Sequence, residues 1–283
     1  MYIVRHGKGR HGVVGLHGWS GDHKTFDPLL PHLSPETTFF AVDLPGCGKS
    51  PEPKVWEMKS LGHELAKELI ALDHVHLTLA GNCSGALLAL FAIRELREMG
   101  RGDVVGRLVM IDPFAYCPWY LEIFVHPALG PLGWWIYAAT FANPIGRSLL
   151  NLCLRGMRTK DTHLTETFAE VNQRTTWRFL KVMYECGPAS AFQGLPIPVE
   201  IMAGENSFAV VVKSLKIWKK ILPQVVVRVL PGTCHLPIEE DPKSVAKILF
   251  RVPNKVPIPK TKKLSSQSAR QLREERNEMT RGD

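Results

Sequence analysis

One short stretch, Gly81-Asn82-Cys83-Ser84-Gly85, restricts the fold more than any other part of the chain. A β-forming run precedes it and a helix-forming run of small residues follows at once. This order predicts a strand that turns sharply into a helix and holds one side chain at the apex of the turn. Backbone and Cβ atoms crowd there, so small residues are needed two positions before and after the apex. Gly81 and Gly85 meet this requirement around Cys83, whereas the same frame around Ser84 lacks glycine.

Strand-like and helix-like segments alternate along most of the chain. Such alternation is typical of a parallel sheet built from βαβ units, with helices on both faces. It pauses between residues 113 and 196, where the pattern is helical and rich in aromatic residues. Strands are predicted at 2–5, 12–16, 38–42, 76–80, 104–111, 199–203 and 225–230, and helices at 24–33, 58–72, 86–98, 207–221 and 242–250.

The charge of the chain is unevenly distributed. Its 283 residues are 45% hydrophobic and 22% charged, values typical of a globular protein with a sizeable core. Residues 251–283 contain nine Lys or Arg and four Asp or Glu, a net charge of +5, so +3 of the total of +8 remains for the other 250 residues. The basic charge therefore lies mostly in a tail that we expect to be disordered, and it does not indicate a nucleic-acid partner.

The six cysteines contain no Cys-x-x-Cys pair, so the sequence indicates no metal site, and we expect no cofactor. Residues 1–6 carry no apolar signal-peptide core, and a cytoplasmic chain with reduced thiols is expected. The stretch 127–145 is free of Asp, Glu, Lys and Arg but is broken by Pro and Gly, which argues against a membrane span. Together with the tail it is a candidate for peripheral membrane contact, which salt would weaken.

Two other motifs resemble signatures of different functions, but each lacks a feature that its function requires. Arg5-His6-Gly7 is similar to the signature of histidine phosphatases, but nothing downstream supports that chemistry. The run Asp43 to Ser50 ends like a phosphate-binding loop, but Asp43 stands where that loop needs glycine.

Four local patterns, each after a predicted strand, follow the order found in the α/β-hydrolase superfamily, which residues 1–250 resemble. The resemblance implies a mostly parallel central sheet with helices on both faces and a helical cap inserted after the family's sixth strand. Residues 1–112 and 197–250 would then form the core, and 113–196 the cap. The patterns are His17-Gly18-Trp19, Asp43-x-x-Gly46-x-Gly48-x-Ser50, Gly81-x-Cys83-x-Gly85 and His235.

The resemblance also implies a role for each site residue. Cys83 stands where the family more often has serine, and its thiolate would attack an acyl carbonyl. His235 would take the thiol proton and later protonate the leaving group or activate water. The backbone N–H groups of Trp19 and Ser84 would form the oxyanion hole.

The acid that should orient His235 departs from the family pattern. The family usually places an aspartate after its seventh strand, where this chain has Ser207. Some members take the acid from the end of the sixth strand, and Asp112 occupies that place. Glu205 and Ser207 stay open as alternatives, as does the absence of any acid, because a thiol needs less activation than a hydroxyl.

The predicted function is that of an acyl hydrolase, of esterase or thioesterase type, acting through a thioester on Cys83. Its partner would be a small-molecule ester or thioester with an apolar acyl group. An acyltransferase with the same intermediate is one alternative, and a catalytically weakened binding protein on the same fold is another.

Overall fold

The computed structural model describes residues 1–157 and 165–252. Within them a seven-stranded sheet has the order β1-β3-β2-β4-β5-β6-β7, and β1 alone pairs antiparallel, to β3. The predicted mostly parallel sheet is thus confirmed. The strands are β1 Ile3–His6, β2 His11–Leu16, β3 Thr37–Val42, β4 Leu77–Asn82, β5 Val105–Ile111, β6 Val199–Gly204 and β7 Val226–Leu230.

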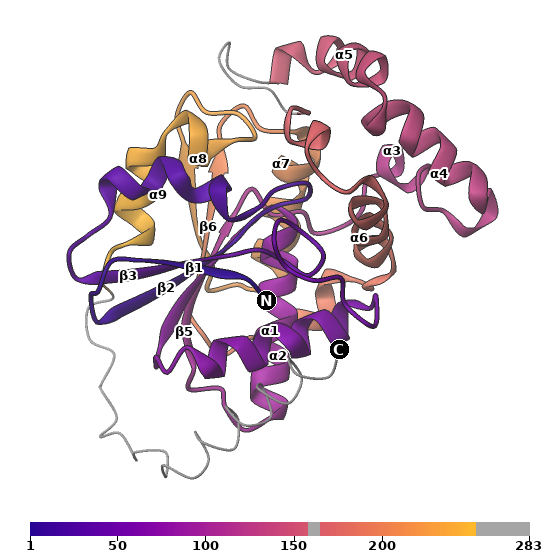
Figure 1. Ribbon diagram of the computed structural model, residues 1–283. Helices are drawn as coiled ribbons and strands as arrows, with labels where there is room; N and C mark the ends of the chain where they lie inside the picture. Colours follow the sequence, from indigo (N-terminus) through magenta and orange to yellow (C-terminus); the bar gives the residue numbers. More distant parts are fainter. Residues whose placement is uncertain (158–164, 253–283) are drawn as a thin grey trace.

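Helices cover both faces of the sheet (Figure 1). One face carries α1 (Met58–Ala71), α2 (Ser84–Glu98) and α7 (Ala209–Ile221). The other carries the helix η1 (His23–His32) with α8 (Pro237–Glu240) and α9 (Pro242–Leu249). The segment η1 is a 3₁₀ helix that contains Pro28 and Pro31, neither of which has a backbone N–H to donate.

Side chains alternate between two cores along the central strands. Leu79 of β4 packs in the cluster that includes α1 and α2, whereas the next residue, Ala80, packs in the cluster that includes η1 and α9. Met110 and Val109 of β5 divide in the same way. This two-residue period follows from the pleat, and burial on both faces explains why these strands read as continuous apolar runs.

The segment between β5 and β6 forms a helical insertion at the edge of the sheet layers (Figure 1). Seven strands are present in the described part of the chain, so the strand counted as the family's sixth is β5. Aromatic side chains build a separate core within the insertion, with Tyr137, Phe141 and Phe168 among them. Its elements are α3 Trp119–Glu122, η2 Pro127–Leu129, α4 Pro131–Tyr137, the π-helix η3 Ala138–Ala142, α5 Pro144–Cys153, η4 Arg155–Met157, η5 Thr167–Ala169, α6 Gln173–Glu185 and η6 Ala189–Phe192.

The tail predicted for residues 251–283 lies outside the described residues except for Arg251 and Val252. Arg251 is tied to the core, because its Nη2 lies 2.9 Å from Oε1 of the buried Glu200. Glu200 also pairs with Arg107 and Arg228.

Candidate active site

Cys83 occupies the turn between β4 and α2, as the sequence predicts. Its φ of 48° and ψ of −112° lie outside the regions that non-glycine residues favour, so the turn is strained. A Cβ on Gly81 would lie 2.3 Å from the Ala86 Cα, and a Cβ on Gly85 would lie 2.2 Å from the Leu16 carbonyl oxygen. The two glycines are therefore sterically required, and they let α2 begin directly behind the cysteine.

His235 follows β7 and meets Asp112, which follows β5. The His235 Nδ1 lies 2.9 Å from Oδ2 of Asp112, a fully buried carboxylate. The backbone N–H of Gly204 donates to the other oxygen of Asp112, Oδ1, at 2.9 Å. The carboxylate is thus held from two sides, with one oxygen aimed at the imidazole.

The other candidates for the acid lie differently. The Ser207 hydroxyl donates to Oδ2 of Asp112 at 2.5 Å and lies 3.4 Å from the His235 Nδ1. Ser207 therefore supports the carboxylate. Glu205 is exposed, and its Oε2 accepts a hydrogen bond from the Gly232 N–H at 2.9 Å. Of Asp112, Glu205 and Ser207, Asp112 is the one that presents a carboxylate to His235.

The electrostatics join His235 to both Asp112 and Cys83. Burial of the imidazole alone would lower its pKa, but hydrogen bonds and charge interactions with Asp112 and with Cys83 raise the pKa from 6.5 to about 10. Because Nδ1 faces Asp112, Nε2 is the ring atom left for the Cys83 thiol. The Phe208 ring covers the imidazole at a centroid distance of 4.4 Å. The arrangement favours the protonated form of the imidazole.

The loop after β2 lies against the cysteine. A Cβ on Gly18 would stand 3.2 Å from the Cys83 Cβ, so glycine lets the loop approach. His17 is fully buried, which lowers its pKa, and its Nε2 accepts the Leu44 N–H at 3.0 Å. His17 is thereby a neutral structural residue. The Trp19 indole N–H donates to the Thr176 carbonyl oxygen at 2.9 Å, which fixes the loop to α6.

The loop after β3 also has a structural explanation. The buried Asp43 carboxylate accepts hydrogen bonds from the backbone N–H groups of His23 and Lys49. Gly48 has a φ of +52°, and a Cβ there would strike that carboxylate at 2.3 Å. The Ser50 hydroxyl donates to the Asp43 carbonyl oxygen at 2.7 Å. Asp43, Gly48 and Ser50 thus hold the loop after β3 in place through contacts within the loop and to His23.

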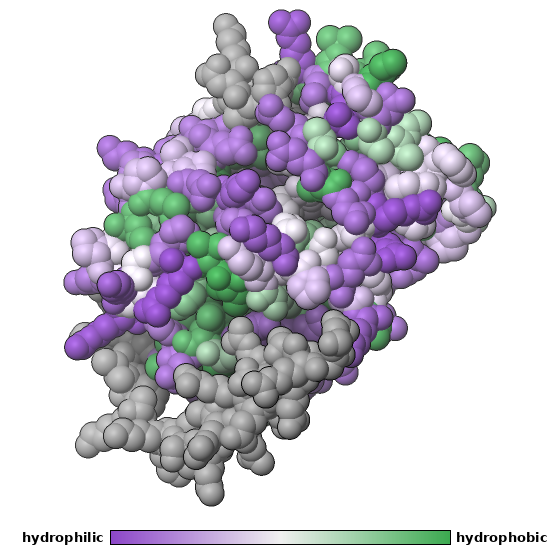
Figure 2. Space-filling model, in the orientation of Figure 1, coloured by the Kyte–Doolittle hydropathy of each residue, from purple (hydrophilic) through white to green (hydrophobic). Residues whose placement is uncertain are grey.

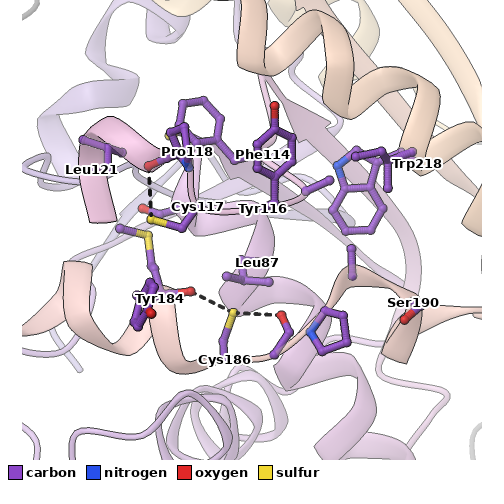
Figure 3. A pocket seen from close by; sticks show the side chains of 18 of the residues that line it. Leu87, Phe114, Tyr116, Cys117, Pro118, Leu121, Tyr184, Cys186, Ser190 and Trp218 are labelled. Carbon is purple, nitrogen blue, oxygen red and sulfur yellow. Dashed lines mark hydrogen bonds between the residues drawn. The ribbon is translucent and has the colours of Figure 1, made fainter. Parts of the chain in front are cut away.

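Two cavities of about 650 and 690 Å³ meet at Cys83, and Trp19, Phe114 and Tyr116 line both. The first, here the α6 cavity, runs between α2, α6 and α7 and includes Ser84 (Figure 3). The second, here the His235 cavity, includes His235 and Phe208 and reaches α3 and α5. Both are lined mainly by apolar side chains.

Several cavity residues were not found from the sequence. Phe208 and Trp218 lie outside the aromatic-rich segment 113–196, and their positions depend on how α7 packs. Cys117 and Cys186 line the α6 cavity. Burial is the main cause that raises the pKa of both thiols, to about 12 for Cys117 and about 11 for Cys186. Among residues 1–157 and 165–252, no group of three or more His, Cys, Asp or Glu side chains could hold a metal ion.

Comparison with known proteins identifies the family of the chain. The family model described as "Alpha/beta hydrolase family" matches residues 13–248. The chain belongs to the alpha/beta hydrolase family. The esterase from Thermogutta terrifontis has a TM-score of 0.69 at 19% identity, covering 87% of this chain and 90% of that one, which shows a common fold.

Similarity to curated proteins is local. A pimeloyl-[acyl-carrier protein] methyl ester esterase of Legionella pneumophila (strain Paris) is 37% identical over 51 residues, which span 18% of this chain and 21% of that protein. A probable serine hydrolase of Drosophila melanogaster is 46% identical over 43 residues, which span 15% and 13%. The matched stretches thus cover about a fifth or less of these relatives.

No helix in the described part of the chain is long and apolar enough to cross a membrane.

Proposed function

We propose that this alpha/beta hydrolase family member is an acyl hydrolase that uses Cys83 as nucleophile, His235 as base and Asp112 as the orienting acid. One observation carries the proposal: a buried carboxylate lies 2.9 Å from the His235 Nδ1, and the same imidazole lines one cavity with the Cys83 thiol at the strained turn. Nucleophile, base and orienting group are thereby linked in sequence, as nucleophilic catalysis requires.

The reaction follows from these positions. The Cys83 thiolate attacks the acyl carbonyl, and the resulting oxyanion is stabilised by the backbone N–H groups of Trp19 and Ser84. The His235 imidazolium gives its proton to the leaving alkoxide or thiolate as the bond to the acyl carbon breaks. A water molecule then loses a proton to His235 and attacks the thioester, which releases the acid and restores the thiol.

The two cavities support an assignment of the two halves of the substrate. The leaving group must lie on the side of His235, because that residue protonates it. It would therefore occupy the His235 cavity. The acyl chain would extend into the α6 cavity, past Leu87 and Met183. The apolar lining favours an apolar acyl chain, and the local similarity to a methyl ester esterase supports an ester as substrate.

The test combines turnover with detection of the intermediate. The protein is incubated with p-nitrophenyl esters and acyl-CoA thioesters of increasing chain length, and intact mass is recorded at short times. An acyl adduct that maps to Cys83, with turnover lost in Cys83→Ala, is the expected result. Turnover by Cys83→Ala equal to that of the parent would overturn the proposal. Added alcohols test transfer: ester products in place of acid would identify an acyltransferase.

A further inference from the structure

The largest of the exposed apolar side chains in the described part of the chain come from one stretch of the sequence. Among the described residues, every exposed Leu, Ile, Trp or Tyr lies between 116 and 152, and the large apolar side chains exposed elsewhere are valines. Trp119 is 74% exposed, Ile145 71% and Trp135 67%. Scattered exposed apolar residues are ordinary, but a concentration of the largest ones marks an interaction site.

Helix α5 is apolar on two sides. Ile145, Leu149 and Leu152 are exposed at the spacing of one helix face, here called the outer face of α5. Leu150, on another side of the helix, and Leu154, just after its end, line the His235 cavity. No residue of α5 is buried. A helix that is apolar around most of its circumference needs an apolar environment on its outside as well.

Two polar side chains of α5, Arg147 and Ser148, hydrogen-bond to the backbone and leave its outer face apolar. The Arg147 guanidinium donates to the carbonyl oxygens of Phe141 and Ala142, and the Ser148 hydroxyl donates to the Pro144 carbonyl oxygen. These side chains are thus bonded to the backbone of the insertion itself. Hydrophobic residues gather over α5 at the top of the molecule in Figure 2.

The charged residues next to α5 in the sequence have a single sign. Between residues 123 and 157 the charged side chains are Arg147 and Arg155, with no Asp or Glu. A short apolar helix face with basic neighbours and exposed tryptophans nearby is the pattern of a helix that lies in the headgroup region of a membrane.

We propose that the outer face of α5 docks on the surface of a lipid bilayer. The helix has ten residues, about 15 Å, so it would lie along the surface without crossing it. Trp119 and Tyr120 are exposed and also line the His235 cavity, which α5 borders. Docking would therefore bring a cavity that leads to Cys83 against the lipid, where apolar esters concentrate.

Vesicle binding tests this independently of catalysis. The full chain is sedimented with sucrose-loaded phosphatidylcholine vesicles, beside Ile145→Glu/Leu149→Glu and the control Val212→Glu, which adds a charge at an exposed valine on α7. We expect the parent and the control to bind, and the double variant to partition at least tenfold less. Binding should persist at 0.5 M salt because apolar contact dominates it, whereas the contact through the basic tail that the sequence suggested would be weakened by salt.

Four results would overturn the proposal. They are the absence of parental binding, equal binding by the double variant, loss of binding on deletion of residues 253–283, and a parental dimer that the double variant converts to monomer in light scattering. The last would identify a second copy of the chain as the occupant of α5. Because the assay needs no turnover, an inactive enzyme that still binds vesicles would refute the proposed function and leave the docking intact.

Discussion

Asp112→Asn separates the roles of carboxylate charge and of fold at this site. Asparagine keeps the size of the side chain, tolerates the φ of 46° at this position, and retains an oxygen that can accept the Gly204 N–H. It replaces the negative charge beside the His235 Nδ1 by a neutral amide. The variant should therefore fold normally while the imidazolium loses its principal carboxylate partner.

The magnitude follows from the pKa of His235. Its rise from 6.5 to about 10 corresponds to about 5 kcal/mol in favour of the imidazolium, supplied by Asp112 and Cys83 against the cost of burial. Asp112 is the first of the causes that raise this pKa, so its removal should cost a few kcal/mol, on the order of a 100-fold loss in kcat/KM. Without the carboxylate the pKa of His235 falls, and the alkaline limit of the pH profile moves to lower pH.

The assay is kcat/KM for a p-nitrophenyl ester between pH 5 and 10, with circular dichroism to confirm folding. Glu205→Gln is the matched control, because it also neutralises a carboxylate near the site but contacts Gly232 instead of His235. We expect Glu205→Gln to stay within threefold of the parent. The reasoning fails if Asp112→Asn also stays within threefold, or if the two variants lose activity equally.

Three further predictions test stability and the substrate cavities. The raised pKa of His235 stabilises the fold fully below pH 6.5, and this contribution is lost as pH rises through about 10. The free energy of unfolding that Asp112→Asn loses, measured by urea denaturation, should therefore be largest near pH 6 and vanish near pH 10. Gly85→Ala should cost about 1–3 kcal/mol in the free energy of unfolding, because the new Cβ would strike the Leu16 carbonyl oxygen. The control Gly156→Ala has open space around its Cβ and should cost less than about 0.5 kcal/mol. Equal urea midpoints for the two variants would contradict this prediction. Leu87→Trp should narrow the α6 cavity and lower kcat/KM for esters with long acyl chains at least tenfold, while acetyl esters are hydrolysed as before. An equal loss of kcat/KM for all chain lengths would contradict the assignment of the acyl chain to the α6 cavity.

The sequence alone determined the turn at Cys83, because its constraint is local. The contacts of Gly81 and Gly85 are set by a strand that runs directly into a helix, and any chain that makes this turn needs small residues there. The order of the strands was also readable, since burial on both faces produces apolar runs separated by amphipathic helices.

Only the tertiary structure decided which carboxylate faces His235. Asp112 and His235 are 123 residues apart, and they meet because parallel strands bring β5 and β7 to the same edge, with β6 between them. Position in the sequence favoured Asp112 but left Glu205 and Ser207 open, because both lie near that edge too. The direction of each side chain separates them: of the three, Asp112 presents a carboxylate to His235. The two cavities, and the apolar outer face of α5, likewise depend on how the insertion packs over the sheet, which no local pattern specifies.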